Sequence, residues 1–278
     1  MSEKIEQMLT YYIRNREHHK FRKPSGDKYR FAAQYRKEGL DDLERSVRRL
    51  QDVLEEETPV VIPGESIVFL RTVVTLPEIH TAEELEELAG KHYIHEQGKV
   101  CNISPDYGKL LNCGLAEKKR ELRDRLVFFE AEGQQEKAAY EKCLLDILES
   151  VEKFIGRYAA EAEKAGNYQA ADLLRRVLSG KPETLLEALQ LLRIIHYCLW
   201  CSFNYHNTLG RFDQYMYPFY QRDLENGTLT RERAFELICS LYLKLNEPKM
   251  RTVQSLSVGG VTTEGKNGAN ELTKLCLE

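Results

Sequence analysis

A chain of 278 residues is long enough for one large domain or two small ones, and its 42% hydrophobic and 30% charged residues are typical of a globular protein. The formal net charge of -4 argues against nucleic acid as the main partner, since nucleic-acid interfaces need an excess of basic residues. No window reaches the roughly 18 to 20 apolar residues of a membrane span, and the N-terminus resembles no signal peptide. We therefore expect a cytoplasmic protein that does not bind a membrane.

The N-terminal part, residues 1–57, is predicted to be helical, with a break at 23–27 where proline and glycine lie close together. Apolar residues recur every three or four positions from Leu40 to Leu54, which indicates an amphipathic helix. His18 and His19 lie in a polar stretch and are expected to be solvated.

An extended region follows this helical part. Pro59 and Pro63 exclude a helix interior, and residues 66–74 are rich in β-branched side chains. That segment is expected to be either a strand or a buried extended stretch. Thr81 and Glu84 have the spacing of a capping box, which predicts the start of a helix.

The rest of the chain is predicted to be mostly helical after a loop at 98–114. The expected helices are 115–130, 134–165, 168–179, a deeply buried apolar helix from Thr184 to Trp200, 212–225, and 231 to about 245 with Thr230 as its cap. Residues 255–260 are the best strand candidate, and a further helix begins within 267–278. The predicted fold class is mainly α with a few strands.

Seven cysteines follow no framework spacing, so they are expected to be reduced thiols that pack as small apolar side chains. Cys198 and Cys201 have the spacing of a redox or metal pair, but the stretch around them is apolar and no second ligand pair exists at zinc spacing. We predict packing for this pair and no metal site.

Residues 204–220 crowd hydrogen-bonding and aromatic side chains directly after the buried apolar helix. Buried polar groups cost about 1–3 kcal/mol each unless they are paired, so such a run implies either a structural network or a pocket. The residues themselves leave both alternatives open.

This run resembles the glycyl radical enzymes of the pyruvate formate-lyase type. Their dehydratase and decarboxylase branches have an Arg-Phe-Asp-Gln-Tyr block and a Tyr-Pro pair, which here are Arg211 to Tyr215 and Tyr217-Pro218. Three further segments match in the same order, at 102–111, 244–246 and 254–260. The resemblance covers nearly the whole chain and is strongest to the glycerol/diol dehydratase-type branch.

Members of that family are more than twice as long and form a ten-stranded β/α barrel wrapped by helices. The resemblance implies that this chain is the N-terminal helical part and the first strand of an incomplete barrel. It implies one N-terminal portion, residues 1–278, with a helical entry segment at 1–57, an extended and loop segment at 58–114, a helical region at 115–250, and the first barrel strand with the next helix at 251–278. A strand near Leu256 and Val258 is expected to lack a partner.

Catalysis in the family uses a cysteine that becomes a thiyl radical and a glycine that stores the radical, on two loops in the later half. A separate activating enzyme with an iron–sulfur cluster and S-adenosylmethionine installs the radical. The resemblance therefore implies that this chain has no catalytic residue, binds no cofactor and is inactive alone. It would meet a small polar substrate, as a lyase/C-acetyltransferase or a dehydratase, only if the barrel is completed, and a homodimer is a possible assembly. The alternative is a standalone, non-catalytic helical module for binding or assembly.

Three positions align with substrate contacts in the diol dehydratase branch, namely Asn102, Tyr205 and His206. An amide, a phenol and an imidazole can all hydrogen-bond a hydroxyl or a carboxylate. The alternatives are loop capping for the asparagine and a buried network for the other two. The last three candidates, Arg211, Asp213 and Gln214, are expected mainly to form a charge-assisted structural network at the helix ends.

Overall fold

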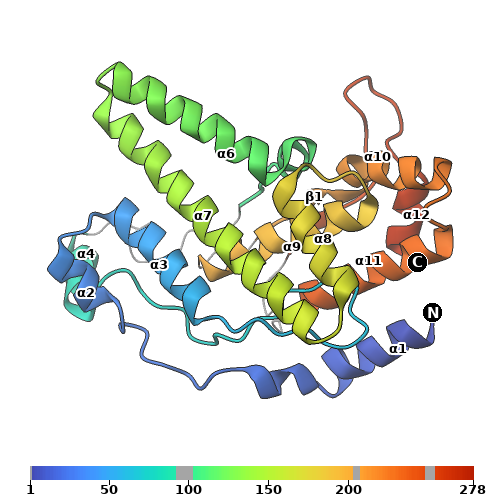
Figure 1. Ribbon diagram of the computed structural model, residues 1–278, viewed down its shortest axis with the longest axis horizontal. Helices are drawn as coiled ribbons and strands as arrows, with labels where there is room; N and C mark the ends of the chain where they lie inside the picture. The colour runs from blue at the N-terminus through green and yellow to red at the C-terminus, as the bar shows by residue number, and fades with distance from the viewer. Residues whose placement is uncertain (1, 92–102, 203–206, 248–253) are drawn as a thin grey trace.

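The computed structural model of the chain describes residues 2–91, 103–202, 207–247 and 254–278. Its architecture is mainly helical, as predicted (Figure 1). The elements in chain order are α1 (Glu3–Leu9), the π-helical turn η1 (Thr10–Arg14), the 3-10 turn η2 (Glu17–Phe21), α2 (Ala32–Glu38), α3 (Asp42–Glu56), α4 (Ala82–Gly90), α6 (Tyr107–Ala131), α7 (Gln135–Lys164), α8 (Tyr168–Ser179), α9 (Leu185–Cys201), β1 (Gly210–Arg211), α10 (Phe212–Glu225), α11 (Arg231–Asn246), β2 (Leu256–Ser257) and α12 (Glu271–Leu277).

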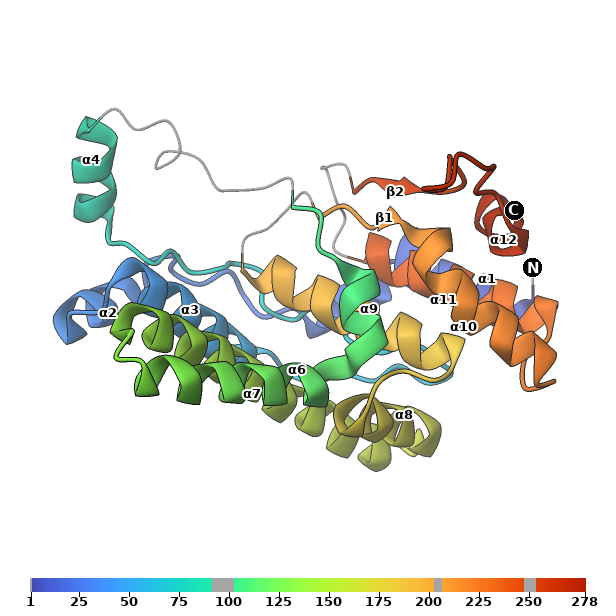
Figure 2. The same cartoon turned by 90° about the horizontal axis from the view of Figure 1, so that it is seen from above.

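The long helices α6 and α7 form a hairpin whose tip points away from the rest of the molecule (Figure 1). Behind it α7 packs against α3 and α8, and α9 packs against α8, α10 and α11. Figure 2 shows α2 and α4 at one end of the molecule and the two strands with α12 at the other. None of the helices in the described part combines the length and the apolar character that crossing a bilayer would require.

Helix α9 is the centre of the core because it is apolar on almost every side. Leu185, Leu189 and Leu192 are fully buried. Its start follows from the sequence, since the Thr184 hydroxyl accepts from the Glu187 N–H in a capping box. The predicted starts at Thr81 and Thr230 are confirmed by the same kind of side-chain cap.

The segment from Glu57 to Val73, hereafter the threaded segment, passes through the core without forming a strand (Figure 1, cyan). The expectation of a buried extended stretch is the correct one of the two that the sequence left open. Side chains replace the hydrogen-bonding partners that a sheet would supply. The Val68 N–H donates to Gln190 at 2.9 Å. The Tyr158 hydroxyl accepts from the Leu70 N–H and donates to the Leu70 carbonyl, both at 2.9 Å.

Further side-chain contacts pair other polar groups of the threaded segment. Glu57 is buried and accepts from the N–H groups of Thr72 and Val73 at 2.7 and 3.1 Å. Arg193 donates to the Phe69 carbonyl at 2.8 Å. Unpaired buried backbone groups are costly, so these contacts allow an extended chain to cross an apolar core.

Two local predictions are wrong. The predicted loop at 98–114 is helical from Tyr107 onward, and the non-helical Gly114, with φ of 78° and ψ of 173°, divides α6 at a kink. A Cβ at Gly114 would lie 2.6 Å from the Gly180 carbonyl oxygen, so close packing requires glycine there. His18 is buried rather than solvated, because its ring packs on Tyr12 and its Nε2 hydrogen-bonds the Glu247 carbonyl oxygen at 3.1 Å.

Candidate functional site

The predicted site residues divide into two groups. Asn102, Tyr205 and His206 lie outside the described residues, and their contacts with substrate stay a prediction. Arg211 ends β1, and Asp213 and Gln214 lie in the first turn of α10.

A small parallel sheet places these residues. Gly210 pairs with Leu256 and Arg211 with Ser257. Just before β1 in the chain, Asn207 forms a separate parallel bridge with Ile103, which belongs to a third segment. These two bridge partners directly follow Asn102 and His206 in the sequence, and their bridge joins two segments that are far apart in the chain.

The strand prediction for 255–260 is too long, because β2 covers only Leu256–Ser257 and ends before Val258. The expectation that this strand lacks a partner is wrong, since β1 lies beside it (Figure 2). β1 precedes β2 in the chain, so the predicted strand is the second of the two strands within the described ranges. Sequence reasoning missed β1 because a strand of only two residues is too short to show a period-two pattern.

Asp213 fastens the start of α10 to the segment that follows β2. Its side chain is fully buried, and its Oδ2 accepts from the Gly259 N–H at 2.7 Å. The Thr273 hydroxyl in α12 donates to the same oxygen. The carboxylate thereby joins three elements that meet at the end of the sheet.

Arg211 and Gln214 also bind the glycine-containing segment that follows β2. The Arg211 guanidinium donates to the carbonyl oxygens of Gly259 and Val261 at 2.7 and 2.9 Å. Gln214 donates to the Gly268 carbonyl at 2.7 Å. A Cβ at Gly268 would approach the guanidinium to 2.8 Å, so this glycine leaves room for Arg211. These contacts support the predicted structural role, which substitution has to test.

Beneath the threaded segment lies a buried ion pair that sequence reasoning missed. Arg193 Nη2 lies 3.1 Å from Glu247 Oε2, and the two side chains are 1% and 0% exposed. Arg193 also contacts His196, whose pKa burial and the neighbouring guanidinium lower to about 3. A charged residue inside an otherwise apolar helix was the available signal, since such residues are rarely buried unless paired.

A second buried ion pair involves a residue close to Glu247 in the chain. The Lys244 ammonium contacts the Glu65 carboxylate and donates to the Tyr12 hydroxyl at 2.7 Å. Burial lowers the pKa of Lys244, and the adjacent carboxylate opposes that shift. Removing one partner of such a pair would leave an uncompensated buried charge.

Cys198 and Cys201 are both buried, as predicted for packed thiols. Burial raises the pKa of Cys198 to about 12 and that of Cys201 well above its ordinary value. Within the described ranges, no three His, Cys, Asp or Glu side chains gather as potential metal ligands.

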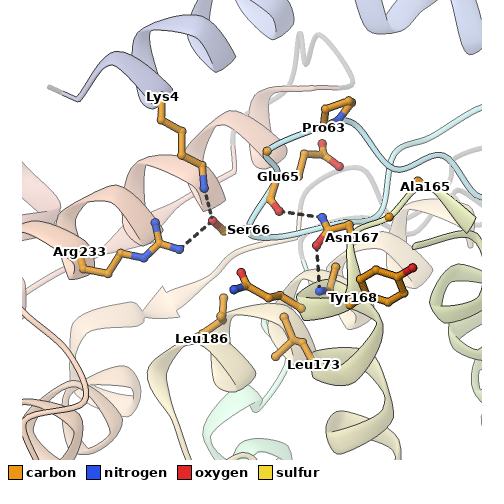
Figure 3. A pocket seen from close by; sticks show the side chains of 14 residues that line it. Lys4, Pro63, Glu65, Ser66, Ala165, Asn167, Tyr168, Leu173, Leu186 and Arg233 are labelled. Atoms are coloured by element: carbon orange, nitrogen blue, oxygen red, sulfur yellow. Dashed lines mark hydrogen bonds between the residues drawn. The ribbon is translucent and has the colours of Figure 1, made fainter. Parts of the chain in front are cut away.

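A pocket of about 480 Å³ opens between the threaded segment, the α7–α8 turn, α1 and α11 (Figure 3). Lys4 and Arg233 both point at Ser66 on its wall. Asn167 donates to the Glu65 carbonyl at 3.3 Å and caps α8. Sequence reasoning missed this pocket, because its lining comes from five separate parts of the chain.

Comparison with known proteins gives a match to the family model described as pyruvate formate lyase-like over residues 77–278. A curated relative, (2S)-3-sulfopropanediol dehydratase from Klebsiella oxytoca, is 36% identical over 47% of this chain and 19% of its own length. The chain therefore spans only a small part of that relative.

Solved structures match almost the whole chain. A glycyl radical enzyme from Archaeoglobus fulgidus aligns with 99% of it at a TM-score of 0.79 and 21% identity. A structure concerned with 1,2-propanediol dehydration in Roseburia inulinivorans aligns with 99% at a TM-score of 0.80 and 22% identity. The chain spans 46% and 45% of those two proteins. An incomplete glycyl radical enzyme barrel fits these alignments.

Proposed function

Because this chain belongs to the pyruvate formate lyase-like family, we propose that it forms the N-terminal, helix-rich part of a cytoplasmic glycyl radical dehydratase. The observation that supports this most is the parallel pairing of β1 with β2. Parallel strands need a crossover connection, and here α10 and α11 supply it. Two-residue strands are too short for an independently stable sheet, so we infer that further strands of the whole protein extend this one.

The proposed substrate is a small polar molecule bound beside this sheet. Asn102, Tyr205 and His206 would hydrogen-bond its hydroxyl or carboxylate groups. The bridge between their neighbours Ile103 and Asn207 supports a common location. The names of the relatives, which include diols, support the chemical class.

The radical chemistry of the whole protein is proposed to need the cysteine and glycine loops that the family resemblance places in the later half. An activating enzyme with an iron–sulfur cluster and S-adenosylmethionine would generate the radical. The chain by itself is then inactive and binds no cofactor.

Electron paramagnetic resonance tests this proposal directly. The purified chain is incubated anaerobically with a reduced activating enzyme and S-adenosylmethionine, and then with 1,2-propanediol. We expect neither a glycyl radical signal nor an aldehyde product. A radical signal on this chain would overturn the proposed inactivity.

The same preparation addresses the alternative of a standalone binding or assembly module. That role is favoured by the continuous hydrophobic core, which joins the threaded segment to α7–α12. A monodisperse chain with a cooperative melt that binds a full-length relative would support the module. Light scattering on the same sample would show whether the chain is a homodimer.

A further inference from the structure

The pocket between the threaded segment and the α7–α8 turn contains polar groups to which the proposed dehydratase function gives no role (Figure 3). The Lys4 ammonium and the Arg233 guanidinium donate to the Ser66 hydroxyl oxygen at 3.0 and 3.1 Å. A hydroxyl oxygen has two lone pairs, and these two donors occupy both. Ser66 can therefore make its remaining hydrogen bond only by donating its own proton.

No acceptor for that proton occurs among the residues that the structure describes. Both neighbours of the hydroxyl are cations, so the proton has to point away from them. A ligand that satisfies Ser66 must then bring an acceptor oxygen, and the two cations favour one with negative charge.

The balance of charge around the pocket is positive. The Glu236 carboxylate lies 2.8 Å from the Arg233 guanidinium and neutralises one of the two positive charges. Glu65 also lines the pocket, but its carboxylate accepts from Lys244 and Tyr12. Burial lowers the pKa of Lys4, and Arg233 lowers it further while Glu236 opposes the shift. A bound anion would relieve the repulsion between the two cations.

We propose that this pocket binds a small oxyanion, a carboxylate or phosphate group, through Lys4, Arg233 and the Ser66 hydroxyl proton. Tyr168 and Gln169, the first two residues of the twelve-residue helix α8, line the same pocket, so the positive end of the helix dipole favours an anion there. The site stands independently of the function proposed above.

Isothermal titration calorimetry on the full chain tests the site with inorganic phosphate and, separately, with acetate, at constant ionic strength in chloride. We expect saturable one-to-one binding of at least one of the two. Saturation by phosphate alone would identify a phosphate site, and saturation by acetate a carboxylate site. Arg233→Gln should weaken that binding about tenfold, since a charge-assisted hydrogen bond is lost.

Arg231→Gln is the matched control, because Arg231 lies on the same helix and pairs with Glu278 outside the pocket. It should change the affinity less than about twofold. Ser66→Ala keeps both cations and should weaken binding by about threefold or more through loss of the proton donor. Thermal melts confirm that each variant is folded. Absence of saturable binding of both anions, or equal effects of the two arginine variants, would overturn the proposal.

Discussion

The helical layer of α7, α8 and α9 and the threaded segment share one core but are stabilised in different ways. In the helices the backbone satisfies its own hydrogen bonds, and many buried apolar side chains share the stabilisation. The threaded segment has no strand partner in the described chain, so single polar atoms of Tyr158, Gln190 and Arg193 bind its backbone. Loss of one contact in the helical layer therefore leaves many others in place. Loss of one hydrogen bond to the threaded segment leaves a buried backbone group without a partner.

Phe69 shows the difference most clearly. It has φ of 86°, a conformation unfavourable for a bulky residue, and its side chain is fully buried. Its ring stacks on Tyr158 with centroids 4.1 Å apart, while Arg193 binds its carbonyl oxygen. Tertiary contacts thus maintain a backbone conformation that local preferences oppose.

The largest expected effect comes from Arg193→Met. The substitution removes the donor to Phe69 and leaves Glu247 buried without its partner. The free energy of unfolding should fall by about 3–5 kcal/mol in urea titrations. Arg175→Met is the control, because the Arg175 side chain is 49% exposed and forms a surface ion pair. The urea midpoint of this variant should stay close to that of the wild type. Equal losses in both would contradict the special dependence of the threaded segment on Arg193.

Asp213→Ala should have the next largest effect, because the N–H of Gly259 and the hydroxyl of Thr273 lose their acceptor. We expect a loss of about 1–3 kcal/mol and faster amide hydrogen exchange in 254–278. Exchange in α7 should keep its wild-type rate relative to global unfolding. Unchanged exchange in 254–278 would show that Asp213 does not fasten this region.

Tyr158→Phe removes one hydroxyl and keeps the ring that stacks on Phe69. Both hydrogen bonds with Leu70 are lost, so the free energy of unfolding should fall by about 1–3 kcal/mol in urea titrations. Tyr168→Phe is the control, because that side chain is 67% exposed, and its urea midpoint should match the wild type. A Tyr158→Phe protein as stable as the wild type would mean that the hydroxyl does not hold the threaded segment.

The smallest effect at neutral pH concerns His18. Burial lowers its pKa to about 4, and the nearby charges of Arg22, Lys244 and Arg16 act in the same direction. The unfolded histidine titrates near about 6.5, so between these values the unfolded chain binds a proton that the folded chain does not. Stability should fall as the pH drops from about 6.5 to about 4.

His18→Gln removes this contribution. Urea midpoints at about pH 7 and about pH 5 should therefore differ less in the variant than in the wild type. An equal decrease in both proteins would show that His18 does not titrate as its burial implies.

Much of the fold was predictable because helices depend on local patterns. The cap at Thr184, the apolar run of α9 and the start of α10 at Phe212 are all visible in consecutive residues. The candidate site was only partly predictable. Arg211, Asp213 and Gln214 stand out as a motif, but their partners in 259–268 lie 46 to 54 residues further along and become neighbours only in the folded chain.

Spacing along the chain is enough to locate the starts of most helices, the faces that they bury and the family that the chain resembles. It does not reveal the path of the threaded segment, the burial of His18 or the pairing of β1 with β2, which become visible only once the chain is folded. Each of these depends on contacts between residues far apart in sequence, and short-range periodicity contains no information about such partners.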